Sequence, residues 1–145
     1  MKLSFWVLAT LFLVSCNNEN KEDVKEKIVY DMYVPSEMSI LMQEMYDYNL
    51  QLKKDIVEGK TPTEFPNDFL NIHSAQLSNF KKRNERFKSF SNVFINAEKE
   101  IFNDQSTLSL KERFNNTINV CVSCHQKECT GPIPKIKKLL IANNN

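Results

Sequence analysis

Residues 109–129 read SLKERFNNTINVCVSCHQKEC and combine a helix start, an apolar face and a cluster of cysteines. Ser109 and Glu112 have the spacing of a capping box, in which each side chain accepts a hydrogen bond from the backbone N–H of the other residue. The residues that follow at four-three-four spacing are Phe114, Ile118, Cys121 and His125. Because such spacing places side chains on one face of a helix, we predict a last long helix with cysteine and histidine on its inner face.

Three further amphipathic segments precede this helix. The first is predicted to begin at Ser36, a good N-cap, and to end at Gly59, which can adopt positive φ. The second is predicted over 66–79 and the third over 82–102. The inward side of the second is expected to carry Phe69, Leu70, His73 and Leu77. Four such segments joined by short connections predict an all-α fold, an antiparallel four-helix bundle with the cysteine motif on its last helix.

The remaining chain is expected to be short and irregular. Residues 131–134, GPIP, are predicted to end regular structure, with one more turn in the tail that follows. The 145 residues are enough for one domain with one core. The 19 basic side chains are balanced by 18 acidic ones, so no basic field indicates nucleic-acid binding. Only two glycines beside ten phenylalanines favour a helical protein over a β-rich one.

The N-terminal residues have the pattern of an export signal. Lys2 precedes an apolar run at 3–14 that is too short to span a bilayer. The run ends in Leu13-Val14-Ser15-Cys16, which resembles the lipobox of bacterial lipoproteins. The resemblance implies cleavage before Cys16 and attachment of acyl chains to it, which would anchor the protein durably in a membrane. The alternative is an ordinary signal peptide that happens to end near a cysteine.

This reading divides the chain into three parts. Residues 1–15 would be the lipoprotein signal peptide, and residues 16–34 the lipidated cysteine and a flexible tether. The tether is expected because its first residues are almost wholly polar and cannot bury enough apolar surface to order themselves. Residues 35–145 would form the domain. The expected location is the bacterial cell envelope, lipid-anchored and facing the periplasm or the cell surface.

Residues 121–125 form the pattern C-x-x-C-H. Two thiols at this spacing can add to the two vinyl groups of haem, and the histidine that follows can supply the proximal nitrogen to the iron. An exported chain strengthens this interpretation, because cytochrome c maturation takes place outside the cytoplasm. We therefore predict one covalent haem c, with Cys121 and Cys124 as thioethers and His125 as proximal ligand.

Three other uses of the cysteines were weighed. A disulfide between Cys121 and Cys124 would leave His125 without a role, and a thioredoxin-like dithiol needs a βαβ setting that this sequence lacks. Zinc is the main rival, since Cys129 adds a fourth potential ligand to these three. Zinc sites usually draw ligand pairs from separated segments, which disfavours the cluster but leaves a zinc-stabilised structural lipoprotein as an alternative.

The helix layout and the C-x-x-C-H motif on the last helix resemble the class II c-type cytochromes, that is, cytochrome c prime and its low-spin four-helix-bundle relatives. The resemblance covers about 35–138 and includes IVEGKTP at 56–62. The ending CHQKECTGPIPKIKKL at 124–139 more closely resembles a set of small bacterial lipoprotein cytochromes. In class II bundles the first helix covers the distal side of the haem. Low-spin members supply a methionine from it, and high-spin members leave the iron open.

The distal ligand has several candidates. Met38, Met42 and Met45 follow four-three spacing on the inward stripe of the first helix, although such methionines are usually core fillers. Alignment of Gly59 with the corresponding glycine of the low-spin members favours Met42, and then Met45. His73, on the apolar side of the second predicted helix, is a further alternative, and an open distal site is another.

The expected function is that of a lipid-anchored monohaem c-type cytochrome, not an enzyme, that carries single electrons at the extracytoplasmic membrane surface. The alternative is a five-coordinate haem protein that binds NO or CO. The expected partners are a redox protein and the membrane, and the resemblance also implies a possible homodimer. Lys135, Lys137 and Lys138 either guide that redox partner or belong to a solvated tail. Cys129 is a reactive thiol, an intermolecular disulfide partner or a small buried side chain.

Overall fold

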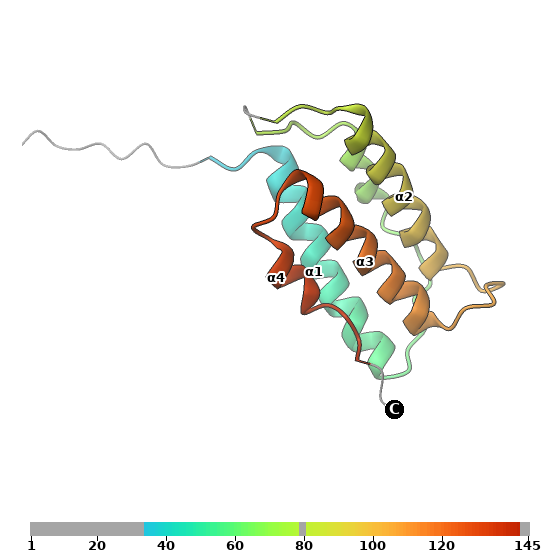
Figure 1. Ribbon diagram of the computed structural model, residues 1–145. Helices are drawn as coiled ribbons and strands as arrows, with labels where there is room; N and C mark the ends of the chain where they lie inside the picture. The colour runs from blue at the N-terminus through green and yellow to red at the C-terminus, as the bar shows by residue number, and fades with distance from the viewer. Residues whose placement is uncertain (1–33, 79–80, 143–145) are drawn as a thin grey trace, which may run out of the picture. The chain divides into compact units, whose positions relative to one another are not determined.

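The computed structural model describes residues 34–78 and 81–142, which contain five helical segments joined by loops (Figure 1). They are α1 (Glu37–Val57), the 3₁₀-helix η1 (Asn67–His73), α2 (Glu85–Ile101), α3 (Leu110–Glu128) and α4 (Ile133–Lys137). These residues contain no strand, which confirms the all-α prediction. The predicted signal peptide, Cys16 and nearly all of the tether lie outside the described residues.

The long helices begin where side chains can bond the free N–H groups of the first turn. The Ser36 hydroxyl accepts a hydrogen bond from Ser39 N at 3.3 Å, and Ser109 and Glu112 form the predicted capping box at the start of α3. Asn84 Oδ1 accepts from Phe87 N at 2.8 Å, which starts α2 three residues later than predicted. The two caps predicted from sequence are thus confirmed.

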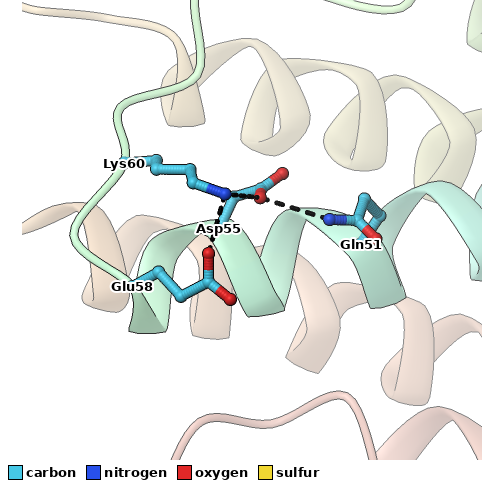
Figure 2. Close-up of polar contacts among 4 residues, drawn as sticks. All are labelled: Gln51, Asp55, Glu58 and Lys60. Atoms are coloured by element: carbon cyan, nitrogen blue, oxygen red, sulfur yellow. Dashed lines mark hydrogen bonds and ion pairs between the residues drawn. The ribbon is translucent and has the colours of Figure 1, made fainter.

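Gly59 lies just beyond the end of α1 and has φ +79°, as its position after the helix predicts. The turn lets Lys60 fold back over the last turns of α1 (Figure 2). Its Nζ lies 2.7 Å from Glu58 Oε2 and 3.2 Å from Asp55 Oδ1, and Gln51 Nε2 donates to the same Asp55 oxygen. Exposed ion pairs contribute little stability. The backbone conformation of Gly59 therefore determines where α1 ends, and the ion pairs add little to the stability of this turn.

The second predicted helix is wrong in extent and type, because only Asn67–His73 is helical and forms a 3₁₀-helix. Its buried residues, Phe69 and Ile72, are three apart, which is the period of a 3₁₀-helix and not of an α-helix. Of the four residues predicted to face inward, Phe69 is buried and Leu77 packs against buried residues, whereas Leu70 is 41% exposed and His73 is also exposed. Beyond η1 the backbone bonds to α1 instead of continuing a helix, with Met38 N donating to Gln76 O at 3.0 Å.

The tail forms the one further turn that was predicted, but this turn begins inside residues 131–134, which therefore do not end regular structure. Helix α4 begins at Ile133, and Ile136 and the nearby Leu139 are buried. Lys53 of α1 donates to the backbone carbonyls of Lys138 and Leu140 at 2.8 and 2.9 Å. The tail is therefore packed on the helices and is not a solvated extension.

Helix α3 contacts α1, α2 and α4, and η1 contacts α1 and α2. Two apolar clusters form the interior between these elements. The methionine cluster consists of Met38, Leu41, Met45, Phe69, Ile72, Ala75, Phe87, Phe94 and Ile95. The packed cluster consists of Leu52, Ile101, Phe114, Ile118, Val122, Ile136 and Leu139. Cys121 is partly buried and packs against both clusters. Within the described residues, no helix combines the length and the apolar character needed to cross a membrane.

Candidate functional site

Cys121, Cys124 and His125 line one cavity of about 580 Å³. They lie three and four residues apart on α3, and this spacing places them on the same side of the helix. The cavity volume falls within the range of about 300–1,000 Å³ that is usual for small-molecule and cofactor sites. The structure therefore confirms that these three side chains face a common interior space, as their spacing on the last helix predicted.

The opposite wall of the cavity comes from α1. Met38, Met42 and Met45 all line it, as the inward stripe predicted. Met38 and Met45 are buried in the methionine cluster, whereas Met42 is only partly buried and packs against that cluster. A smaller cavity of about 40 Å³ is also lined by Met42, Met45 and the three α3 residues. Thioether side chains thus lie across the interior from the cysteine–histidine cluster.

His125 is held by the end of its own helix. Its Nδ1 lies 2.9 Å from the backbone carbonyl oxygen of Cys129, and Cys129 N in turn donates to the carbonyl of His125 at 3.0 Å. A carbonyl oxygen can only accept, so Nδ1 must carry the proton. In the neutral imidazole the lone pair is then on Nε2, which is the form in which histidine binds a metal.

The environment of the two motif thiols favours their protonated form. Burial raises the pKa of Cys121 far above its usual range, and the Glu98 carboxyl adds to the effect. Burial, with a smaller effect from Glu128, raises the pKa of Cys124 to about 11. Reactive dithiols have a lowered thiol pKa, so the site lacks the electrostatics of a redox dithiol. Both cysteines are free thiols, with no disulfide between them.

The zinc alternative receives no support from the geometry. Nowhere in residues 34–78 and 81–142 do three or more His, Cys, Asp or Glu side chains form a group that could hold a metal ion. Cys129, the proposed fourth ligand, is exposed, which also excludes the interpretation that it is a small buried side chain. A haem needs only one or two protein ligands to its iron, so this absence does not bear on haem.

His73 is not brought to the cluster. It lies at the end of η1, its side chain is exposed, and it lines neither cavity. Its Nδ1 lies 3.2 Å from Ser91 Oγ on α2. The α-helical period placed His73 inward, but the three-residue period of η1 places Phe69 and Ile72 there instead.

Lysines lie at the edge of the cavity. Lys81, Lys82 and Lys135 are exposed residues that also contribute to its lining. Lys135 Nζ donates to Gln43 Oε1 at 2.8 Å and lies 4.1 Å from the centre of the Tyr46 ring. Lys137 and Lys138 are exposed but do not line the cavity. Of the three lysines noted in the sequence, only Lys135 is part of the site.

Two buried polar residues were missed by the sequence analysis. Glu98 on α2 is 0% exposed and Asn49 on α1 is 3% exposed, and Asn49 lines the cavity. A signal existed for Glu98, because it follows Phe94 by four residues and precedes Ile101 by three on an apolar stripe. The residue type argues against burial, because charged residues are almost never fully buried without a partner.

Comparisons of this chain with protein-family models, with curated proteins and with solved structures found no match.

Proposed function

We propose that this protein is a monohaem c-type cytochrome of the class II type that carries single electrons at the extracytoplasmic membrane surface. The observation that carries the proposal is the state of His125. Its Nδ1–H donates a hydrogen bond to the Cys129 carbonyl. Nε2 is therefore free to bind iron, and two thiols line the same cavity. Haem, when attached there, would supply reversible one-electron chemistry at its iron.

The residues present fit this group. Cys121 and Cys124 would form the two thioethers, and His125 would be the proximal ligand. The cavity presents mainly apolar side chains, and its largest contributions from α2 are Phe87 and Phe94. An apolar surrounding excludes water and helps to set the reduction potential. The chain would thus bind, orient and insulate the cofactor.

The antiparallel four-helix bundle is the finer part of the proposal. The chain between α1 and α2 contains η1, which contacts both helices. This segment would take the position of the second helix of a class II bundle, although only Asn67–His73 is helical. Dimerisation, as in the proteins that the sequence resembles, remains part of the same proposal.

Met42 is the favoured distal ligand. Met38 and Met45 have 7% and 6% of their surface exposed and are held in the methionine cluster, whereas Met42 is only partly buried. Met42 lines both cavities, as Met45 also does. A side chain that borders open space can turn toward a ligand at less cost in packing than one that is enclosed. The alternative with an open iron, which would bind NO or CO, follows if Met42 only packs.

The first test is covalent haem attachment after expression with haem-maturation machinery. The wild-type protein is expected to retain haem through denaturing electrophoresis, while Cys121→Ala or Cys124→Ala is expected to weaken this attachment and the double variant to abolish it. Cys129→Ala is the matched control, because this cysteine lies outside the motif and its backbone carbonyl is unchanged. A wild-type protein without covalent haem would overturn the proposal.

The second test is the spin state in oxidised and reduced absorption spectra. A low-spin spectrum with a methionine–sulfur band that is lost in Met42→Ala but kept in Met38→Ala would support electron transfer. A high-spin wild-type spectrum that shifts on addition of CO would favour gas binding instead.

The lipid anchor is proposed from the sequence alone. Cys16→Ser is expected to release the protein from the membrane fraction, whereas the wild type should remain there after a high-salt wash that removes electrostatically bound protein. Equal fractionation of the two would point to an ordinary signal peptide.

A further inference from the structure

Glu98 is a carboxyl group enclosed in the interior of the molecule. The residue is 0% exposed, and neither Oε1 nor Oε2 has a hydrogen-bond partner among the residues that the structure describes. An ionised carboxylate without partners is very costly to bury, and such a group normally takes up a proton instead. The position therefore favours the neutral acid.

Asn49 beside it is complementary to the neutral acid. Its Nδ2 donates to the carbonyl of Met45 at 3.0 Å, which fixes the orientation of the amide. The other end, Oδ1, is buried and has no donor among the described residues. A carboxylate has only acceptors, but a protonated carboxyl has one O–H donor. Only a protonated Glu98 therefore has a donor for Asn49 Oδ1, whereas the amide N–H of Asn49 favours the ionised form by less than burial disfavours it.

The charge of an ionised Glu98 also affects the pKa of a residue in the candidate site. Its carboxyl contributes, after burial, to the raised pKa of Cys121, whose side chain lines the large cavity. Asn49, which lies beside Glu98, lines that cavity too. A change of charge at Glu98 and a change of charge in the cavity are therefore coupled electrostatically through the desolvated interior.

The other titratable groups that face Glu98 do not neutralise it. Tyr48 of α1 and Cys121 of α3 have raised pKa values to which Glu98 contributes. On η1, Asp68 and His73 are exposed, and His73 contacts Ser91, two helical turns from Glu98 along α2. Burial raises the pKa of Glu98 to about 8, the Asn49 amide lowers it by less, and no basic side chain among those described contributes.

We infer that Glu98 exchanges a proton with solvent as the protein is oxidised and reduced, so that electron transfer is coupled to proton release. This inference rests on the proposed haem. As one electron leaves for the redox partner, the positive charge gained in the cavity favours the Glu98 anion. Its O–H bond then breaks and the proton passes to solvent. On reduction an electron enters from the partner and Glu98 takes up a proton.

The test is the midpoint potential measured by spectroelectrochemistry as a function of pH. In the wild type the potential is expected to fall as pH rises through about 8, because the Glu98 anion stabilises the ferric state. Glu98→Gln should flatten this dependence, whereas Glu44→Gln, an exposed carboxyl on α1, should leave it unchanged. Equal pH dependence in all three proteins would overturn the inference and assign the coupling to the haem propionates.

A second measurement needs no variant. Redox-difference infrared spectra of the wild type should show the C=O band of a carboxylic acid in the reduced protein that is lost on oxidation. Absence of this band change would contradict the inference even if Glu98→Gln failed to fold. If haem is attached but neither measurement shows a proton linked to its oxidation, only the proposed role of Glu98 is refuted. If no covalent haem is found, the proposed function itself is refuted.

Discussion

The two apolar clusters of this protein differ in how completely their side chains are enclosed. In the packed cluster Phe114 and Ile118 are 0% exposed and Ile101 is 1% exposed. Both clusters border the 580 Å³ cavity, the packed cluster through Ile118, Ile136 and Leu139, but only the methionine cluster also borders the 40 Å³ cavity. Close-packed interiors supply folding energy, while hollow ones supply binding sites. The comparison indicates that the most completely enclosed side chains belong to the packed cluster, whereas both clusters contribute to the wall of the candidate site.

The largest contrast is expected between a truncation in each region. Phe114→Ala should lower the free energy of unfolding by about 3–5 kcal/mol, because it leaves a void in a filled interior. Met42→Ala should cost less than about 2 kcal/mol, because its side chain is partly buried and already borders open space. Urea denaturation of both variants measures the difference. Equal losses would mean that the two clusters are equally well packed.

Glu98 gives the next effect, as a pH dependence of stability. Its pKa is raised from 4.5 to about 8, so the folded protein keeps a proton that the unfolded chain loses over this range. Stability should therefore fall as pH rises through that range, by about 1.4 kcal/mol per unit and roughly 5 kcal/mol in all. Below and above it, Glu98 should contribute no pH dependence.

Glu98→Gln should remove this part of the pH dependence, so denaturation curves of the variant and the wild type should diverge progressively toward pH 8. The variant should be the more stable of the two at the upper end. Parallel curves would mean that the carboxyl is already ionised in the folded state, with donors that compensate its charge.

The smallest effect concerns the start of α3, the helix that leads into the packed cluster. Ser109→Ala removes one half of the capping box and should cost about 1 kcal/mol in thermal or urea unfolding. Ser89→Ala, at an exposed position inside α2, is the control and should cost nothing, because alanine is the better helix former. A loss at both positions would indicate a general effect of serine removal.

Much of the fold and of the candidate site could be predicted from local chemistry. The caps at Ser36 and Ser109 and the turn at Gly59 depend on a few neighbouring backbone groups, so their residues suffice to identify them. The inward placement of Met42 and His125 depends on the α-helical period, which long helices keep.

The rest depends on contacts between distant parts of the chain. The segment after Gly59 forms a 3₁₀-helix, whose three-residue period moves His73 to the surface, and its return to α1 depends on the Met38 to Gln76 bond. The tail packs because Lys53 and Asn115 hold its backbone, and both are remote in sequence. The burial of Glu98 could not be predicted from its position on the apolar stripe, because a charged side chain on such a stripe is almost never fully buried without a partner.

The bond that holds His125 has a consequence for genetics. Its acceptor is the main-chain oxygen of residue 129, which every amino acid possesses. A side-chain scan of this position would therefore leave the bond intact and would classify residue 129 as dispensable. The orientation of His125 depends on the path of the backbone at the end of α3. Most substitutions at residue 129 would therefore leave it unchanged. Only changes that redirect the chain at that point would expose its importance.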